Sequence, residues 1–487
     1  MKTLLKNNSV YLVALLFIAA NLFFMWRGEI LFNAIPIALL LVYVAFYHFE
    51  QLFLFVVMFT PLSVNIEEFV SSDVGLFLPT EPLLFGMLLI LILNQMKKNQ
   101  FDARILKHPI SIIFILQLLW IGMTCISSEM PMVSIKFLMT KLWFIVPIFF
   151  YGVMFFKKES NVKWFVGLFI ASLTIVVLYT LTNHAINGFD EESGHWVMFP
   201  FFKDHTSYGA ILALIYPVFF GLLFGRKNSP QMRIILIGLI VLFAFAIIMS
   251  YTRAAWITLF GAFVVFLFIR FKVKFKYLAM VGAVGAIYVA VNWTSIMHSA
   301  EKNNAEHATE NMNERLESMT NVTTDASNLE RLNRWGCAIR LWQERPFLGW
   351  GPGTYAMVYA PFQLASGKTI ISTNSGNRGN AHSEYLGPLS EQGLPGMLLM
   401  ILLVVYICYT AVKLYIRMPE GEMRNLMLSL FLGLVTYFAH GILNNYLDTD
   451  KATIPVWGFT AIIVMLDLKY PVKKNSEVTV LDEDLNE

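Results

Sequence analysis

The sequence predicts an all-α fold, a polytopic bundle of transmembrane helices with one large extracytoplasmic loop that is partly helical. Of the 487 residues, 57% are hydrophobic and 14% are charged, whereas soluble domains are about 25% charged. The hydrophobic residues are spread along the whole chain, and three cysteines are too few for a disulfide framework. These observations exclude an ordinary water-soluble globule. The small net charge of +3 gives no support to nucleic-acid binding.

Fourteen segments have the length and composition of membrane spans, and we expect about 12–14 spans. A span needs about 20 mostly apolar residues, because a helix rises ~1.5 Å per residue across ~30 Å of hydrocarbon. The segments are 10–26, 30–49, 51–66, 82–96, 109–127, 136–156, 163–183, 205–225, 232–251, 254–271, 276–297, 393–417, 424–445 and 454–468. The chain then divides into eleven transmembrane helices over 1–297, the large loop over 298–392, three more helices over 393–470, and an acidic tail over 471–487 that we expect to be disordered and cytoplasmic.

Lysine and arginine follow every second predicted span. They cluster at 97–107, 157–163, 226–233, 270–276, 413–424 and 469–474. Because short cytoplasmic loops keep the positive charge, both termini are expected in the cytoplasm and the large loop on the outer face of the membrane.

Within the large loop, a helix is expected to begin at the capping box Ser327-Asn-Leu-Glu330 and to stop at Pro346. Its apolar residues recur at three- and four-residue steps and form one stripe. The stripe consists of Leu329, Leu332, Trp335, Ile339 and Trp342. One interpretation is a helix that lies in the membrane interface with its tryptophans at headgroup depth. The glycines of 349–353 then predict a tight turn.

The polar segment 377–385 favours a functional interpretation of the loop. It contains Arg378, His382 and Glu384 within seven residues and leads into the span 393–417 from outside. Such groups are costly at the membrane surface unless they are used. Glu384 either orients His382 or faces water.

Two cations lie on the side where positive charge is otherwise avoided. Arg253 stands between the spans 232–251 and 254–271, and Lys203 just precedes the span 205–225. Arg253 alone could be a snorkelling arginine at a helix end. Together the two residues suggest an anionic ligand, and a diphosphate fits best because a guanidinium binds phosphate oxygens through two hydrogen bonds.

Other histidines have less specific surroundings. His205 follows Lys203 closely and could be a base, a ligand or a polar residue at a helix start, whereas His440 near the end of span 424–445 is expected to bond across helices. His184 and His195 are expected to be solvated. No metal-ligand spacing such as HExxH or CxxC is present, so we expect no metal and no cofactor.

Several of these motifs together resemble the O-antigen ligase and O-antigen polymerase family of bacterial envelope glycan enzymes. They are residues 334–355 (RWGCAIRLWQERPFLGWGPGTY), 381–386 (AHSEYL), 391–396 (EQGLPG) and the preceding 250–253 (SYTR). The resemblance covers roughly 195–400. It implies a GT-C-like enzyme of the bacterial inner membrane that transfers a glycan from a polyprenyl diphosphate on the periplasmic face, without metal. His382 matches the family's histidine and would activate the acceptor hydroxyl, and Arg253 matches the arginine that holds the diphosphate.

This chain departs from the family pattern at two positions. Ser383 replaces the asparagine that usually follows the histidine, and Lys203 stands where ligases tend to carry an arginine. With Arg253, Lys203 and Arg378 on the leaving diphosphate and His382 as base, a single displacement would invert the anomeric centre. His205, Glu384 and His440 would support them.

Several functions remain open. The acceptor of a ligase is lipid A-core, that of a polymerase is a second lipid-linked glycan, and protein O-glycosylation is a further variant; the histidine segment and the large loop favour the ligase. A flippase or transporter of lipid-linked sugars is the main rival from another class. It would usually carry a carboxylate near the membrane midplane, and the predicted span interiors hold Gln117 but no such acid. A scaffold would not need Arg253 and His382 on one side.

Overall fold

A computed structural model describes residues 2–28, 33–69, 75–97, 102–225, 228–273, 330–364, 372 and 379–471, with short pieces between 280 and 295. Predictions for most of the span 276–297 and for the tail beyond 471 lie outside these residues.

The described chain is built almost entirely of helices, which confirms the all-α prediction. Among the described residues, eight helices are long and apolar enough to cross a membrane. The helices are α1 (Lys2–Trp26), α2 (Ala34–Tyr47), α3 (Phe49–Phe59), α4 (Thr80–Lys97), α5 (Ala103–Leu106), α6 (Pro109–Ile126), α7 (Pro131–Phe144), α8 (Gly152–Phe155), α9 (Glu159–Ile186), α10 (His205–Leu223), α11 (Pro230–Met249), α12 (Arg253–Arg270), α16 (Tyr355–Val358), α17 (Leu386–Arg417), α18 (Glu422–His440) and α19 (Asp450–Lys469). A π-helical turn over Ile145–Tyr151 joins α7 to α8.

Local sequence explains where several helices begin. Asp204 accepts a hydrogen bond from the backbone N–H of Ser207 at the start of α10, and Ser229 accepts one from Met232 at the start of α11. Such caps satisfy N–H groups that have no partner within the helix.

The predicted span 51–66 is wrong in its second half. Helix α3 ends at Phe59, just before Pro61, and residues 64–65 form strand β1 (Val64–Asn65). This strand pairs antiparallel with β2 (Phe77–Leu78), with Val64 opposite Leu78. Proline has no N–H to continue the helical ladder, so the chain turns here.

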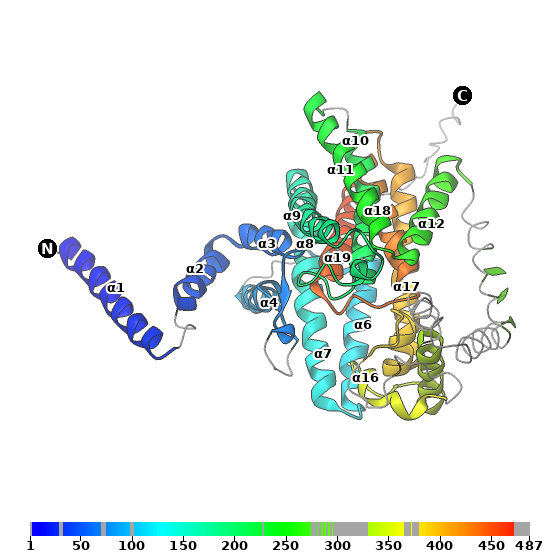
Figure 1. The fold of residues 1–487 in the computed structure, drawn as a ribbon, viewed down its shortest axis with the longest axis horizontal. Helices are drawn as coiled ribbons and strands as arrows, with labels where there is room; N and C mark the ends of the chain where they lie inside the picture. The colour runs from blue at the N-terminus through cyan, green and yellow to red at the C-terminus, as the bar shows by residue number, and fades with distance from the viewer. Residues whose placement is uncertain are drawn as a thin grey trace, which may run out of the picture.

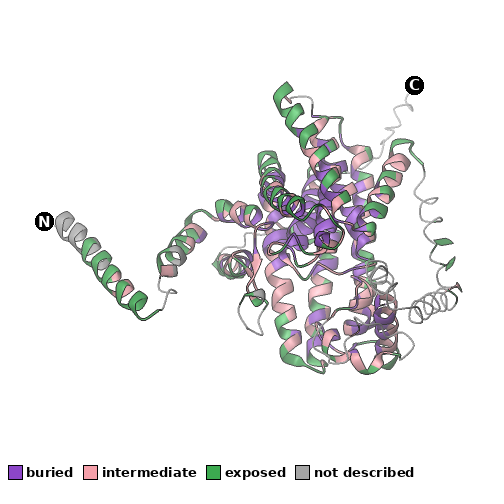
Figure 2. Cartoon of the chain, in the orientation of Figure 1, coloured by how far each residue is buried: buried purple, intermediate pink, exposed green. Residues whose placement is uncertain are grey.

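Helix α19 forms the centre of the bundle. It is buried over 89% of its most apolar window, whereas α11 and α12 are buried over 22% and 17%. Figures 1 and 2 show the buried residues gathered around α19, with α1 and α2 extending away from the rest. Helices α10 and α18 pack closely, since a Cβ on Gly433 would lie 2.2 Å from the carbonyl oxygen of Leu214. Small residues allow this approach between membrane helices.

Loops that the charge pattern assigns to the cytoplasm lie together at one end of the bundle. Ion pairs join the start of α9 to the start of α18 through Lys163 and Glu422, and to the end of α19 through Glu159 and Lys469. The turn between α6 and α7, assigned to the opposite side, instead contacts the large loop, where Ser134 Oγ donates to Pro352 O at 2.8 Å. The alternation of the loops agrees with this arrangement.

Helices α19 and α4 begin earlier than predicted and bring buried ionisable residues into the bundle, which the prediction of acid-free spans missed. Asp450 is fully buried, and Glu81 is 4% exposed. Asp450 accepts hydrogen bonds from Ser63 and Thr80, at 2.5 Å each. Lys451 donates to the backbone carbonyls of Thr60, Pro61 and Ser63. Asp450, Lys451 and Glu81 all lie in the first turn of a helix. The hydrogen bonds of Asp450 and Lys451 therefore join the start of α19 to the end of α3 and the start of α4.

Candidate active site

The helix expected in the large loop is present over residues 330–344, and it ends before Pro346 as predicted. Residues 327–329 of the predicted capping box lie outside the described chain. The helix buries a face that the apolar stripe did not predict. The buried positions are Glu330, Asn333, Arg334, Cys337, Ala338 and Leu341. The members of the stripe that are described are only half-buried, and the face that packs on the protein carries both polar and apolar residues.

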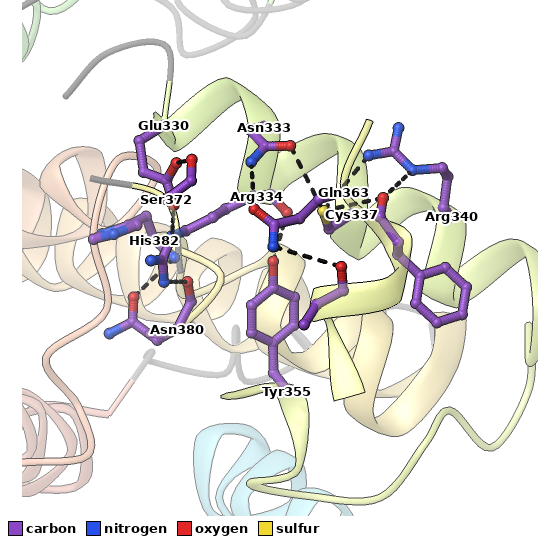
Figure 3. Close-up of polar contacts among 12 residues, drawn as sticks. Glu330, Asn333, Arg334, Cys337, Arg340, Tyr355, Gln363, Ser372, Asn380 and His382 are labelled. Atoms are coloured by element: carbon purple, nitrogen blue, oxygen red, sulfur yellow. Dashed lines mark hydrogen bonds and ion pairs between the residues drawn. The ribbon is translucent and has the colours of Figure 1, made fainter. Parts of the chain in front are cut away.

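Arg334 fastens the helix to the segment that carries His382 (Figure 3). Its Nε donates to Glu330 Oε1 at 2.7 Å, and its Nη1 donates to the carbonyl oxygen of Asn380 at 3.1 Å. Both side chains are nearly inaccessible, at 7% and 4% exposure. Gly379 passes directly over the guanidinium with φ +122°, where a Cβ would lie 1.6 Å from Nη1. Only glycine fits that position.

The backbone of His382 is held in a left-handed conformation, with φ +48°. Its N–H donates to Asn380 Oδ1 at 3.0 Å, and its carbonyl accepts from Trp335 Nε1 at 3.2 Å. Strained conformations of this kind persist where surrounding contacts over-determine them, and they concentrate at functional sites. Ser383, which stands in the family's asparagine position, accepts hydrogen bonds from the N–H groups of Tyr385 and Leu386 at the start of α17. Serine therefore serves as a cap there, as asparagine also can.

The imidazole of His382 lies among polar groups from the end of α18. The side chain of Asn444 lies beside it, and Asn444 Nδ2 lies 3.1 Å from His440 Nε2. Burial and the charges of Arg334 and Arg331 lower the pKa of His382 to about 3. The imidazole is therefore neutral near pH 7.

The sequence suggested that Glu384 contacts either His382 or water, but the structure gives its carboxylate other partners. Its Oε1 accepts hydrogen bonds from Tyr437 OH at 2.8 Å, Tyr446 N at 2.7 Å and Leu447 N at 2.9 Å. Burial and the charge of Asp448 raise its pKa to about 7. The carboxylate thus holds the loop between α18 and α19 against the His382 segment, and its three hydrogen bonds go to that loop and to Tyr437.

The starts of α10 and α12 meet beside the same loop. His205 Nδ1 lies 3.0 Å from the carbonyl of Ser250, and Thr252 Oγ1 donates to the carbonyl of His205 at 2.8 Å. Thr206 Oγ1 lies 2.5 Å from the hydroxyl of Tyr446. Since Tyr446 also contacts Glu384, this chain of contacts links residues 250–253 to the His382 segment.

The two predicted diphosphate-binding residues that are described are both exposed. Arg253 is the first residue of α12, and Lys203 lies just before α10. Because the hydroxyl of Thr252 donates to His205, it does not cap α12. The first N–H groups of α12 therefore lie beside Arg253 without a side-chain cap. Arg378 lies outside the described residues.

His184 and His195 differ from the expectation that they are solvated. His184 is 1% exposed, and its Nε2 lies 2.8 Å from the carbonyl of Asp190. The ring of His195 stacks on that of His205 with centroids 4.2 Å apart.

The glycine-rich turn over 349–353 is fitted against a kink in α17. Gly393 has φ +71°, and its Cβ would lie 2.2 Å from the carbonyl oxygen of Phe347. Glu391 accepts hydrogen bonds from the backbone N–H groups of Gly353 and Tyr355 at 2.9 and 3.0 Å. Trp120 Nε1 donates to the Gln392 carbonyl at 2.9 Å, which satisfies a group near the kink. The turn at 349–353 thus packs against the motif at 391–396 and is hydrogen-bonded to it.

Sequence reasoning missed Arg331, Arg334, Asn444 and Tyr446. The spacing of Glu330 and Arg334, four residues apart, was a detectable sign of an ion pair on one helix face. Asn444 and Tyr446 gave no such sign, because their partners lie about sixty residues away in the chain.

The described residues contain no group of three or more His, Cys, Asp or Glu side chains that could hold a metal ion. No curated protein matches the chain. A family model described as O-antigen ligase matches residues 238–401. The match spans Arg253, the large loop and the kinked start of α17, and it confirms the resemblance carried by the sequence motifs. The chain is therefore a polytopic membrane protein whose residues 238–401 are similar to the O-antigen ligase family.

Proposed function

We propose that the protein is a glycosyltransferase of the bacterial inner membrane, GT-C-like, which moves a glycan from a polyprenyl diphosphate to an acceptor on the outer face. The main support is the position of His382 within the residues that match the family model. Its imidazole is neutral and lies beside Asn444, and Arg334 and Trp335 hold the backbone of its segment. We propose lipid A-core as the acceptor, as in a ligase. A second lipid-linked glycan or a protein hydroxyl are the alternatives.

In this proposal the donor's diphosphate binds at the start of α12. Arg253 extends from that helix start, and a helix N-terminus favours an anion through its N–H groups and its dipole. Lys203 supplies a second cation from the start of α10, with Arg378 as a third. Arg331 supplies further positive charge near the site. It lies close enough to His382 to lower the pKa of that residue, and it also lies near His205.

The reaction needs one proton transfer and one displacement. The acceptor oxygen attacks the anomeric carbon while its proton passes to the imidazole of His382. The bond between the anomeric carbon and the diphosphate oxygen breaks, and the cations take up the negative charge of the leaving group. One such displacement inverts the anomeric centre. It uses no metal ion, and we expect EDTA to leave turnover unchanged.

The pKa of His382 predicts the shape of the pH profile. Because the folded protein lowers this pKa to about 3, the imidazole stays neutral at pH 5. A histidine with the usual pKa near 6.5 would lose roughly 30-fold in the neutral form at that pH. Glu384, with a pKa of about 7, is a second titrating group. The profile of kcat/KM is therefore best measured in Glu384→Gln, whose amide oxygen can still accept hydrogen bonds from Tyr446 N and Leu447 N. We expect no acidic limb between pH 8 and 5 in that variant, and a limb near 6.5 would contradict the environment assigned to His382.

Arg253→Lys is expected to lower kcat/KM for the donor at least tenfold, because an ammonium keeps the charge but loses the two-pronged contact with phosphate. Arg270→Lys is the matched control, since Arg270 is the exposed last residue of the same helix at its other end. The measurement is release of polyprenyl diphosphate over a range of donor concentrations. Wild-type turnover by Arg253→Lys would remove Arg253 from the diphosphate site.

The proposed function is tested with purified protein in lipid and a polyprenyl-diphosphate-linked oligosaccharide. Release of polyprenyl diphosphate only when lipid A-core is added indicates a ligase. Release from donor alone, with longer lipid-linked chains, indicates a polymerase. No release, together with movement of the donor across a sealed bilayer, would overturn the transferase in favour of a flippase.

A flippase gains little support from the buried ionisable residues. Asp450 and Lys451 hydrogen-bond to groups at the end of α3 and the start of α4, so they join helix ends. Coupled transport usually places such groups near the midplane, on interrupted helices.

A further inference from the structure

A cavity of about 320 Å³ lies beside the candidate active site, between α6, α7, α17 and α19 and against residues 379–384. Its wall includes Ala381 and Ser383 but not His382, so the cavity is separate from the polar groups around the imidazole. Its volume is within the range of small-molecule sites, about 300–1,000 Å³. Nothing in the proposed reaction uses it so far.

The charged groups of this cavity are compensated by the protein. Lys141 Nζ donates to Asp448 Oδ1 at 2.7 Å and to the carbonyl of Leu447 at 2.9 Å. The carboxylates of Glu384 and Glu391 each accept hydrogen bonds from backbone N–H groups. The cavity therefore offers no uncompensated cation to a diphosphate, and a neutral ligand fits it better.

Two lining residues keep hydrogen-bond acceptors without partners among the described residues. They are Gln392, through Oε1, and Asn445, through Oδ1, and both atoms are buried. Gln392 is only 2% exposed. Buried polar atoms in native proteins nearly always have a partner. Gln117, an amide within the membrane span α6, lies on the same wall. Once the side chains of Gln392 and Asn445 turn their oxygens toward the cavity, these amides suit a ligand that donates several hydroxyl hydrogens.

The remaining wall is partly aromatic, with Phe137, Tyr355 and Trp457. Amides that bind hydroxyls, together with rings that cover apolar C–H faces, suit a sugar ring. We propose that this cavity binds one neutral sugar residue of a glycan substrate, next to the residue that reacts. The proposal rests on the proposed function, and the sugar belongs either to the donor glycan or to the acceptor glycan.

Gly387 allows a direct test. It lines the cavity from the first turns of α17, and a Cβ built on it meets no atom within 4 Å. Gly387→Leu would therefore fill the cavity from a helical position without a clash at Cβ. Gly86→Leu is the matched control, because Gly86 is also helical, has the same open space and lies away from the cavity on α4. Gln392→Leu, which removes one acceptor at similar volume, is the second variant.

The probe is the oligosaccharide of the cells' own lipid-linked pool, released from its lipid and measured by saturation-transfer NMR with the full-length protein in lipid. We expect wild type, Gly86→Leu and His382→Asn to bind it equally, and Gly387→Leu and Gln392→Leu to bind it at least tenfold more weakly. Inorganic diphosphate should not compete. Equal binding by Gly387→Leu, or no binding by wild type, would overturn the sugar site.

Transfer assays separate this proposal from the proposed function. A raised KM in Gly387→Leu for the donor alone, or for the acceptor alone, supports the site and identifies which glycan occupies it. Unchanged KM values for both substrates overturn the sugar site and leave the transferase intact. Binding that depends on Gly387 in a protein without any transfer activity supports the sugar site and overturns the transferase.

Discussion

His382→Asn is expected to lower the rate of glycan transfer by 10²- to 10⁴-fold, the usual contribution of a general base. Asparagine is the sharpest replacement because it adopts positive φ more readily than other residues with a side chain. It therefore keeps the backbone at φ +48° and removes only the imidazole. Turnover by purified protein in lipid measures the loss, which corresponds to about 3–5 kcal/mol in the barrier.

Comparing His382→Ala with His382→Asn separates the loss of the base from the strain of the left-handed backbone. Alanine also lacks the base, but it fits the left-handed backbone less well, so we expect the same loss of activity together with a lower melting temperature. Donor binding should be close to wild type in the asparagine variant. More than a tenth of wild-type turnover in His382→Asn would show that His382 is structural.

Arg334→Ala is expected to destabilise the large loop by about 3–5 kcal/mol, because it leaves the carboxylate of Glu330 buried without its ion-pair partner. It also removes the hydrogen bond to Asn380 O that holds the His382 segment. Transfer activity should fall with it. Limited proteolysis of the large loop and thermal unfolding in lipid measure the effect.

Arg345→Ala is the matched control for Arg334→Ala. Arg345, just after the other end of the same helix, pairs with Glu129 in an exposed ion pair, at 37% and 51% exposure. Exposed pairs contribute about 0–1 kcal/mol. The double variant Arg334→Met with Glu330→Leu should recover part of the stability, since it leaves no buried charge unpaired. Equal stability of Arg334→Ala and Arg345→Ala would contradict the role assigned to Arg334.

Helix positions were predictable, because a membrane span is specified by local composition. The predicted segment 109–127 corresponds to α6 (Pro109–Ile126), for example, and the predicted stop at Pro346 is present. The span 51–66 failed where apolar residues continue past the proline that ends α3. Bulk hydrophobicity detects spans, but the backbone chemistry of single residues determines where they end.

The interior of the large loop was less predictable. The apolar stripe through Trp335 and Ile339 was the natural candidate for the packed face, yet Arg334 and Cys337 are buried instead. Near a membrane, apolar side chains are not forced inward, so hydrophobic periodicity loses its usual meaning there. The links from His382 to Asn444 and from Glu384 to Tyr446 join distant segments, and a single sequence contains no local sign of them.

The packing of the glycine-rich turn at 349–353 against the kink in α17 has a consequence for biosynthesis. Residues 346–355 emerge from the ribosome before the kink at Gly393 that receives them, and the turn hydrogen-bonds to Ser390, Glu391 and Leu394. The turn therefore cannot take its final form until α17 has been synthesised and inserted. His382 lies between these two segments in the chain, and the neighbouring Glu384 bonds to Tyr446 and Leu447, which follow α18. Completion of the candidate active site is in this way coupled to synthesis of the last membrane helices.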